Sequence, residues 1–453
     1  MAGVVTILLV SQNLFAKTYG EANNDEAYSI TRVSDGGYVM AGTTYDPWGE
    51  NSDFLAVKID PSGNLSWVKA FGGANRDEAY FVTSTSDGGS AIVGRAWTLS
   101  DTNVSIAFIK LDSSGNWTLA KRFGGARGDV AKSVVQTSNG GYAVAGYTNS
   151  FGAGGNDLLV LKLNPDGSLA WARTFGGTSD DYAYSIIQTT DGGYAVAGFT
   201  YSFGAGNDDF LVLKLNPDGS LAWARTFGGT SYDWPYSITQ TTDGGYAVAG
   251  VTLSFGAGSY DFLLLKLNPD GSLAWARTFG GTNYDFAESI TQTTDGGYAV
   301  AGMTENFGAG GEDFLVLKLG PDGDYTDCVD TCSPVVDTPS PSTSTPSVGA
   351  TCSPSTSSPT PTVNTPSLTI TDACPPVETK EIDLSDPRPG ITCSPFPGGA
   401  MFISSGEMPI KIYSADGRLT YSGKLEKGKN RIGLETGVYI WNAGNFKGKL
   451  AVR

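Results

Sequence analysis

The feature that most constrains this 453-residue chain is a strict internal repeat. A turn of the form Asp/Asn-Gly-Gly recurs every 52 residues, at positions 35–37, 87–89, 139–141, 191–193, 243–245 and 295–297. A fixed period of this length is typical of repeat proteins in which each copy forms one supersecondary unit. The chain is therefore predicted to contain six copies of a single small unit.

Each copy is predicted to hold four strands joined by tight turns. In the fourth copy the predicted strands are Ala183–Thr190, Tyr194–Thr200, Phe210–Leu215 and Leu221–Phe227. The turn Asn216-Pro217-Asp218-Gly219 has hairpin chemistry, because Pro presets φ and Asp-Gly tolerates positive φ. No stretch keeps a 3.6-residue apolar period, so almost no helix is expected. Four antiparallel strands in a repeat of roughly 40–50 residues are typical of a propeller blade.

The two ends of the repeat region predict how a ring closes. The last copy stops after its third strand, with Asp327 where an aromatic residue is expected. Asn13–Gly20 matches Leu221–Gly228 in register, so this N-terminal segment is predicted to supply the missing outer strand of the sixth blade. The predicted fold is all-β: a six-bladed β-propeller of 52-residue, four-stranded blades over residues 13–327, followed by a small C-terminal β-sandwich.

The repeats resemble those of bacterial and archaeal secreted surface-protein β-propellers, which read roughly FGG…DGGY-x-V-A-G. In the fourth copy the pattern is Phe175-Gly176-Gly177, Asp181, Ser185-Ile186, Asp191–Tyr194, Asp209-Phe210 and Trp223. The resemblance implies the propeller fold and a place at the cell surface, and it implies no particular activity. The second copy departs most from the pattern, with Ser90 in place of Tyr and Leu119 in place of Trp.

The segments outside the repeats predict export. Residues 1–16 contain the apolar run Gly3–Val10, which resembles the core of a secretory signal peptide and is too short to span a membrane. An ordinary strand is the alternative. Residues 328–400 are rich in Ser, Thr and Pro and are predicted to form an extended linker. All five cysteines lie there, at 328, 332, 352, 374 and 393, and this odd number predicts one or two disulfides plus a free or intermolecular thiol.

Residues 401–453 return to strand-like patterning with turns between the strands, which predicts the small sandwich. The segment resembles the C-terminal sorting domain of type IX secretion, and the motif Gly437-Val438-Tyr439 is part of that resemblance. The resemblance implies contact with the secretion machinery and an extracellular or outer-cell-surface location. A plain accessory β-domain remains the alternative.

Composition excludes several classes of function. There is no histidine, which excludes a Ser-His-Asp or Cys-His nucleophile and any His-ligated metal. The formal net charge of −17 argues against nucleic acid as a partner, since binding a phosphate backbone needs clustered Lys and Arg. Glycoside hydrolysis by two carboxylates needs no histidine, so this chemistry stays open.

Two recurring aspartates are candidate ligand-binding residues. The first recurs at the start of each copy and includes Asp181, Asp233 and Asp285, and the second includes Asp209 and Asp261. The loops that carry them are expected on one face, where their carboxylates are candidates for Ca²⁺, sugar hydroxyls or a basic partner. No other cofactor is expected. The alternative is that each Asp accepts hydrogen bonds from the loop amides of its own blade, and its presence in nearly every blade favours that.

Aromatic residues at variable positions of the same loops are the better recognition candidates. They are Tyr182, Tyr232, Trp234, Tyr260, Tyr284 and Phe286. Such side chains stack on sugar rings or anchor a protein partner, and packing between blades is the alternative.

Two functions therefore stand as hypotheses. The first is a non-catalytic binding or display module for a surface glycan or protein, favoured by near-identical blades and by the lack of histidine. The second is a carbohydrate-active enzyme that uses carboxylates on the loop face.

Overall fold

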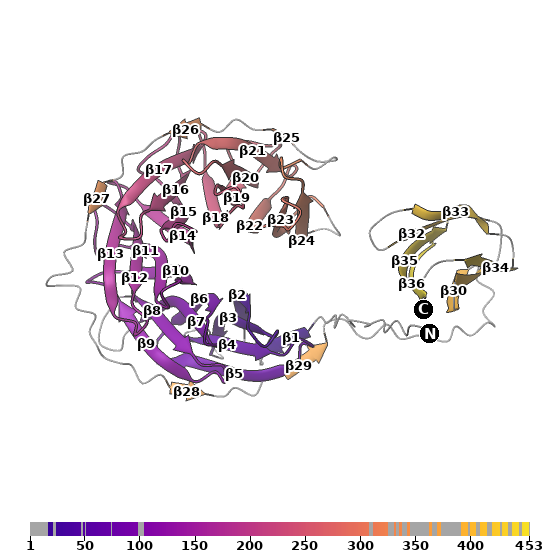
Figure 1. Ribbon diagram of the computed structural model, residues 1–453, viewed down its shortest axis with the longest axis horizontal. Coiled ribbons are helices and arrows are strands. Elements are labelled where there is room, and N and C mark those ends of the chain that lie inside the picture. The colour runs from indigo at the N-terminus through magenta and orange to yellow at the C-terminus, as the bar shows by residue number, and fades with distance from the viewer. Residues whose placement is uncertain are drawn as a thin grey trace, which may run out of the picture. The chain divides into compact units, whose positions relative to one another are not determined.

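The computed structural model describes residues 17–324, apart from 21–23, 47–48, 50, 74, 98–103 and 308–310, and only strand segments after residue 329. Every regular element in this part of the chain is a strand, and none of its segments is a helix that could cross a membrane. The chain divides into two units, Met1–Cys374 and Pro375–Arg453. The first is a six-bladed β-propeller, as predicted (Figure 1).

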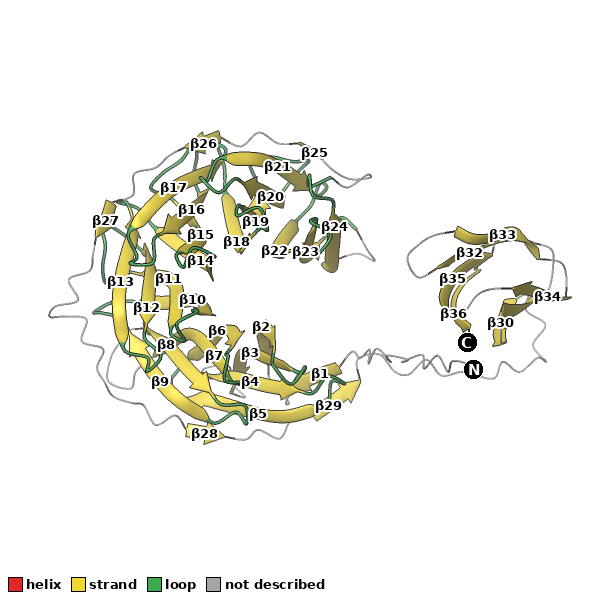
Figure 2. Cartoon of the chain, viewed as in Figure 1, coloured by secondary structure: helices red, strands yellow, loops and turns green. Residues whose placement is uncertain are grey.

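Each blade is an antiparallel sheet whose first strand lies nearest the centre of the ring (Figure 2). Blade 1 holds β2 (Asp25–Arg32), β3 (Tyr38–Tyr45), β4 (Ser52–Ile59) and β5 (Leu65–Gly72). Blade 2 holds β6 (Asp77–Ser84), β7 (Ser90–Trp97), β8 (Val104–Leu111) and β9 (Trp117–Phe123). Blade 3 holds β10 (Asp129–Gln136), β11 (Tyr142–Thr148), β12 (Asp157–Leu163) and β13 (Leu169–Gly176).

The second half of the ring repeats this order. Blade 4 holds β14 (Asp181–Gln188), β15 (Tyr194–Thr200), β16 (Asp209–Leu215) and β17 (Leu221–Gly228). Blade 5 holds β18 (Asp233–Gln240), β19 (Tyr246–Thr252), β20 (Asp261–Leu267) and β21 (Leu273–Phe279). Blade 6 holds β22 (Asp285–Gln292), β23 (Tyr298–Thr304) and β24 (Asp313–Leu319). The strand boundaries predicted for the fourth copy agree with these to within two residues.

The apolar core lies between successive blades. One cluster joins Leu158 and Phe175 of blade 3 to Val196 and Leu211 of blade 4, all fully buried or nearly so. The second strand of each blade carries small residues because it lies very close to the first strand. A Cβ at Gly198 would stand 1.8 Å from the carbonyl oxygen of Tyr182, so any side chain there would force the strands apart. Burial of these side chains is the main source of stability.

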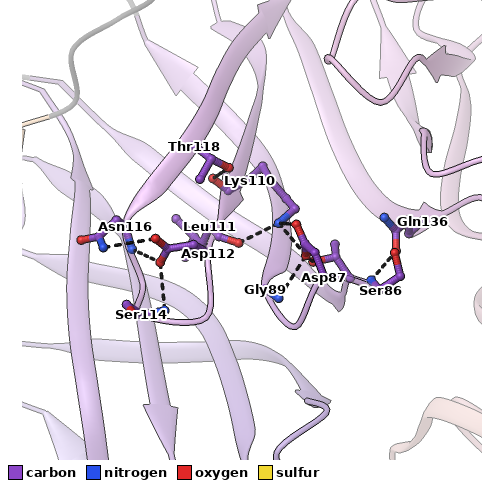
Figure 3. Close-up of polar contacts among 11 residues, drawn as sticks. Ser86, Asp87, Gly89, Lys110, Leu111, Asp112, Ser114, Asn116, Thr118 and Gln136 are labelled. Carbon is purple, nitrogen blue, oxygen red and sulfur yellow. Dashed lines mark hydrogen bonds and ion pairs between the residues drawn. The ribbon is translucent and has the colours of Figure 1, made fainter.

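In each blade, a lysine near the end of the third strand binds the turn between the first and second strands. In blade 2, Lys110 Nζ lies 2.8 Å from Asp87 Oδ2 and donates to the carbonyl oxygen of Leu111 at 2.9 Å (Figure 3). The same Lys–Asp pair closes the turns of blades 1, 4, 5 and 6 at 2.5–2.9 Å. In blade 3 Asn139 replaces the aspartate and still receives a hydrogen bond from Lys162 at 3.3 Å. We refer to the end of the propeller that carries these turns as the turn face.

Two kinds of hydrogen bond link one blade to the next. Near the middle of the first strand, a serine accepts a bond from the backbone N–H of the following blade, as Ser185 does from Ile238 at 3.4 Å. At the turn face, a glutamine Oε1 accepts a bond from a turn amide of the preceding blade, as Gln240 does from Thr190 at 2.9 Å. Gln136, Gln188 and Gln292 make the equivalent bond at 2.7–2.8 Å (Figure 3). Each repeat therefore contains the residues that bond its blade to the neighbouring blades.

The predicted closure of the ring by the N-terminal strand is wrong for the described residues. β1 (Lys17–Gly20) pairs with β29 (Thr369–Asp372) instead of with β24. β1 nevertheless has the contacts of an outer strand toward blade 1, because Lys17 Nζ donates to Asn64 Oδ1 at 3.3 Å, as Arg277 does to Asp324 at 3.1 Å. Residues 13–16, the rest of the predicted closing strand, lie outside the described residues.

The Ser/Thr/Pro-rich segment has more structure than a simple linker. It contributes short strands that pair with the outer strands of blades 5, 4, 3 and 1, in that order along the chain. These are β25 (Asp330–Thr331) on β21, β26 (Val335–Asp337) on β17, β27 (Ser342–Ser344) on β13 and β28 (Thr362–Asn364) on β5, followed by β29 on β1. The outer edges of the blades offer unpaired N–H and C=O groups, and an extended chain satisfies them.

The second unit contains two antiparallel sheets, as the strand pattern predicted. One is β30 (Ile391–Phe396), β31 (Gly399–Ser404) and β34 (Gly428–Gly433). The other is β33 (Leu419–Leu425), β32 (Met408–Ser414), β35 (Gly437–Ala443) and β36 (Phe446–Val452). The motif Gly437-Val438-Tyr439 begins β35. The predicted signal peptide, residues 1–16, and the first four cysteines lie outside the described residues, while Cys393 lies in β30.

The bonds between blades predict a measurable loss of stability. Gln240→Met removes the acceptor for the Thr190 amide and should lower the free energy of unfolding by about 0.5–1.5 kcal/mol, the usual net value of one hydrogen bond. Ser84→Ala is the control, because Ser84 stands at the equivalent position and accepts no such bond among the described residues. Denaturant unfolding measures both variants. Equal stability losses would contradict the assigned role of the glutamine.

The lysine–aspartate turns predict a loss of stability in acid. Burial alone raises the pKa of Asp191, but hydrogen bonds from Lys214, Thr189 and Gly193 outweigh it and lower this pKa to about 2. A pKa below the unfolded-state value means that the stabilisation is complete above about pH 4 and disappears as the pH falls toward 2. Asp191→Asn should therefore make the free energy of unfolding fall less steeply between pH 4 and 2. Denaturant unfolding followed by circular dichroism at each pH measures this.

The matched control is built into blade 3, where the turn already has Asn139. Asn139→Asp should create the missing ion pair with Lys162 and make stability more acid-sensitive between pH 4 and 2. If the free energy of unfolding of both variants depends on pH as it does in the wild type, the ion pairs do not cause the loss of stability in acid.

Candidate functional site

The strand register places two sets of loops at one end of the propeller, which we name the loop face. In blade 4, Asp181 begins the first strand opposite Thr200, which ends the second, and Thr200 pairs with Asp209 at the start of the third. The connections 201–208 and 229–232 therefore emerge on the same side. The other blades repeat this register, so the predicted grouping of these loops is present in the structure.

The first recurring aspartate is buried and hydrogen-bonded within its own blade. Asp181, Asp233 and Asp285 are fully buried. Asp233 accepts bonds from the backbone N–H of Gly229 and the hydroxyl of Ser254, both at 2.8 Å, and from the hydroxyl of Thr252. Asp181 has the same partners in blade 4, and Asp285 accepts from Gly281 and Asn306. These carboxyls therefore hold the loops in place through hydrogen bonds within the protein.

The second recurring aspartate lies against the end of the fourth strand. Asp209 and Asp261 are each 1% exposed, and each accepts a loop N–H, from Ala205 at 2.8 Å and from Ala257 at 2.9 Å. A Cβ at Gly228 would stand 1.8 Å from Asp209 Oδ1, so only glycine fits beside this carboxyl. Burial raises the pKa of Asp209 to about 6 despite the loop hydrogen bonds. No cluster of three metal-ligating side chains occurs within the described part of the chain.

Five of the six predicted aromatic residues come together directly, and Tyr201, which was not predicted, lies beside them. Tyr201, Tyr232, Trp234, Tyr260, Tyr284 and Phe286 form what we name the aromatic surface, on the loop face of blades 4 to 6. The rings of Trp234 and Tyr260 are stacked with centroids 5.5 Å apart, and those of Tyr260 and Tyr284 are stacked at 6.0 Å. Tyr201 and Tyr284 are each 44% exposed, so the surface is open to solvent. Tyr182 joins the group through Phe199, at 4.8 Å.

A carboxyl that the sequence reasoning missed fixes one of these rings. Trp234 Nε1 donates to Asp208 Oδ2 at 2.6 Å, and Asp208 itself is fully buried. Burial raises the pKa of Asp208, and hydrogen bonds from Trp234 and Tyr201 oppose that shift. In the preceding blade the place of Asp208 is taken by Asn156, whose side-chain amide donates to the Tyr182 hydroxyl at 2.8 Å. The Tyr182 hydroxyl in turn donates to Asp180 at 3.2 Å. The hydrogen bonds hold the aromatic side chains in place before any ligand arrives.

A second group missed at the sequence level lines the centre of the ring. One position of each first strand, 52 residues apart, holds Tyr28, Tyr80, Lys132, Tyr184, Tyr236 and Glu288. Lys132 Nζ lies 3.7 Å from the ring centroid of Tyr80 and 5.8 Å from that of Tyr184. The edge of Tyr184 meets Tyr236 at 5.5 Å. We name these six residues the axial ring. The alignment of the copies could have found it, because Lys132 and Glu288 interrupt a column of tyrosines.

The two charged members of the axial ring are both shifted toward neutrality. Burial, together with the nearby Arg95, lowers the pKa of Lys132 to about 8. Burial raises the pKa of Glu288. Phe199 lies 5.7 Å from Tyr184 and 5.9 Å from Trp234, so the axial ring and the aromatic surface form one continuous aromatic region.

Comparison with known proteins gives the same fold. Residues 137–169, 189–221 and 241–273 match a family described as "Domain of unknown function (DUF5122) beta-propeller". The regulatory protein FlaEY of Caulobacter vibrioides is 23% identical over 359 residues, which cover 68% of this chain and 35% of that protein. The chain thus spans about a third of the length of that relative.

The chain also has a distant resemblance to solved structures of several kinds of protein. The WD40 domain of Neurospora crassa Pan2 is 10% identical, with 61% of this chain and 86% of that chain covered and a TM-score of 0.39. An endo-1,5-α-L-arabinanase from Thermotoga petrophila is 12% identical, with 68% and 98% covered and a TM-score of 0.29. The six repeated sheets and the match of three repeats to a β-propeller family model show that the chain is a β-propeller repeat protein.

Proposed function

We propose that the propeller is a non-catalytic binding module whose aromatic surface takes up a glycan. The observation that carries this proposal is the run of stacked, partly exposed rings on the loop face, held by hydrogen bonds that need no ligand. Aromatic faces supply large contact areas at low entropic cost, and sugar rings stack on them through their C–H groups. The buried carboxyl of Asp208 fixes the position of the Trp234 ring within this surface.

The rigidity of the site supports binding over display alone. Trp234 is half-buried, its indole N–H is bonded to Asp208, and its ring is stacked on Tyr260. Little side-chain freedom remains to be lost when a ligand arrives, and such preorganisation increases affinity. A surface that is open to solvent suits an extended polymer better than a small enclosed molecule.

The enzyme hypothesis has weaker support. Carboxylates that cleave a glycosidic bond face the substrate across roughly 5–9.5 Å. The five aspartates named from the sequence are buried and accept hydrogen bonds from their own loops, which supports a structural role for them. A hydrolysis assay run on every polysaccharide that binds tests the enzyme hypothesis directly.

An extracellular setting belongs to the same proposal. A polysaccharide-binding surface fits a protein exported to the cell exterior, which the apolar N-terminal run and the resemblance of residues 401–453 to a sorting domain both predict. Fractionation of cells that produce the full chain, with and without residues 401–453, tests this location independently of binding.

Removal of two rings should abolish most of the affinity. Trp234→Ala and Tyr284→Ala should each weaken polysaccharide binding by about tenfold, because one aromatic contact contributes about 0.5–1.5 kcal/mol beyond its buried area. Affinity electrophoresis against a panel of polysaccharides, followed by calorimetry on those retained, measures the effect. Unchanged melting temperatures would show that the variants are folded.

Tyr284→Phe is the matched control, since it keeps the ring and removes only the hydroxyl. It should bind nearly as well as the wild type. If Tyr284→Phe loses as much affinity as Tyr284→Ala, stacking is not the source of binding. If no polysaccharide is retained but a protein ligand is captured through the same rings, the surface serves protein recognition instead.

A further inference from the structure

The glutamine that links blades at the turn face is absent from the first two blades. Blades 3 to 6 end their first strands with glutamine, while blades 1 and 2 have Arg32 and Ser84 at that position. By the spacing of the other bonds, residue 84 should accept a hydrogen bond from the backbone N–H of Ser34. The serine side chain is too short for this reach, and no such bond is present among the described residues of the two blades.

A pocket lies where the glutamine is missing. It has a volume of about 620 Å³, is open to solvent, and is lined by blades 1, 2 and 3. This volume falls within the range of ligand sites, about 300–1,000 Å³. Its polar lining comes from Arg32, Ser34, Thr83, Ser84, Thr85, Ser86 and Gln136. Figure 3 shows one wall, where Gln136 accepts the Ser86 amide of the neighbouring turn.

The charges around the pocket leave one group without a counter-ion. Asp35 and Asp87, in the two adjoining turns, are paired with Lys58 at 2.5 Å and with Lys110 at 2.8 Å. Arg32 has no ion pair among the residues that the structure describes, and its side chain is exposed. The guanidinium is thus the one uncompensated charge of the lining.

Several of the remaining lining groups can donate hydrogen bonds. The Ser34 amide lacks the acceptor that its counterparts have in blades 2 to 5, and the lining hydroxyls can donate as well. A guanidinium with five N–H groups matches the two oxygens of a planar or tetrahedral oxyanion. An acceptor-rich anion complements this set, whereas a cation does not.

We propose that this pocket binds a ligand through an oxyanion group, with Arg32 as its charged partner. The group is a carboxylate, a sulfate or a phosphate. The site lies on the turn face, at the opposite end of the propeller from the aromatic surface, so it does not depend on the function proposed above. The loss of one glutamine from the repeat creates both the space and the free donor.

Titration calorimetry of the full chain tests the site with sodium sulfate, sodium phosphate and sodium glucuronate, each compared with sodium chloride at equal ionic strength. Saturable heat with at least one oxyanion and none with chloride is expected. The three arms identify which oxyanion the pocket takes. Absence of saturable binding in all three, or the same response to chloride, overturns the proposal.

Two variants remove the site in different ways. Arg32→Gln should weaken binding by about tenfold or more, since it removes the charge-assisted bonds. Ser84→Gln restores the residue of the other blades, which fills the space and accepts the Ser34 amide. It should abolish binding while its melting temperature stays at or above that of the wild type. Wild-type affinity in either variant overturns the proposal, and Arg32→Gln decides if Ser84→Gln fails to fold.

Gln240→Ser is the matched control. It opens an equivalent gap between blades 4 and 5, where the position of Arg32 is occupied by Gln188. Oxyanion binding should remain at the wild-type affinity and stoichiometry, because the new gap has no guanidinium. A second binding site in this variant would show that any gap between turns takes up the anion and that Arg32 is not required.

Discussion

The structure depends on how each blade is fastened to the next. Apolar side chains fill the space between blades, and two directional bonds fix their relative position: a serine hydroxyl near the middle of the first strand and a glutamine at the turn face. Burial is non-directional, so apolar contacts alone would allow neighbouring sheets to slide. Bonds to backbone amides permit one alignment, and the 52-residue period repeats it. Where the period is broken at Ser84, a pocket opens.

This arrangement separates the residues that hold the ring from those that vary. Three kinds of position are nearly the same in every copy: the turn residues, the residues that bond to the neighbouring blade, and the buried loop aspartates. Each of them must fit the packing of one blade on the next. Positions that face the centre or the loop face are released from that requirement. Trp234, Lys132 and Glu288 stand at such positions. The asymmetry needed for recognition therefore lies on an almost symmetric support.

Much of the fold could be predicted, because the information is local and repeated six times. Strand limits, the hairpin turns and the grouping of the loop-face aromatics all follow from the period. The burial of Asp209 could not be predicted from the sequence. A carboxylate beside glycines is equally compatible with a ligand site and with a hydrogen bond to a loop amide of the same protein. Lys132 was missed because the alignment of the six copies was used to find the residues that they share, and Lys132 differs from its counterparts. Closure by the described part of the N-terminal strand, residues 17–20, was wrong since β29, some 350 residues away in sequence, pairs with β1.

The strands that the tail adds to the outer edges give the propeller a mechanical property. The tail meets blade 5 first and β1 last, by ladders of two to four residue pairs. Tension on the C-terminal unit would reach β29 before any other ladder and would peel the tail off one blade at a time. The longer ladders within the blades would open only after these short ones. A protein held by its C-terminus under flow would thus lengthen in small steps while its loop face and turn face stay intact.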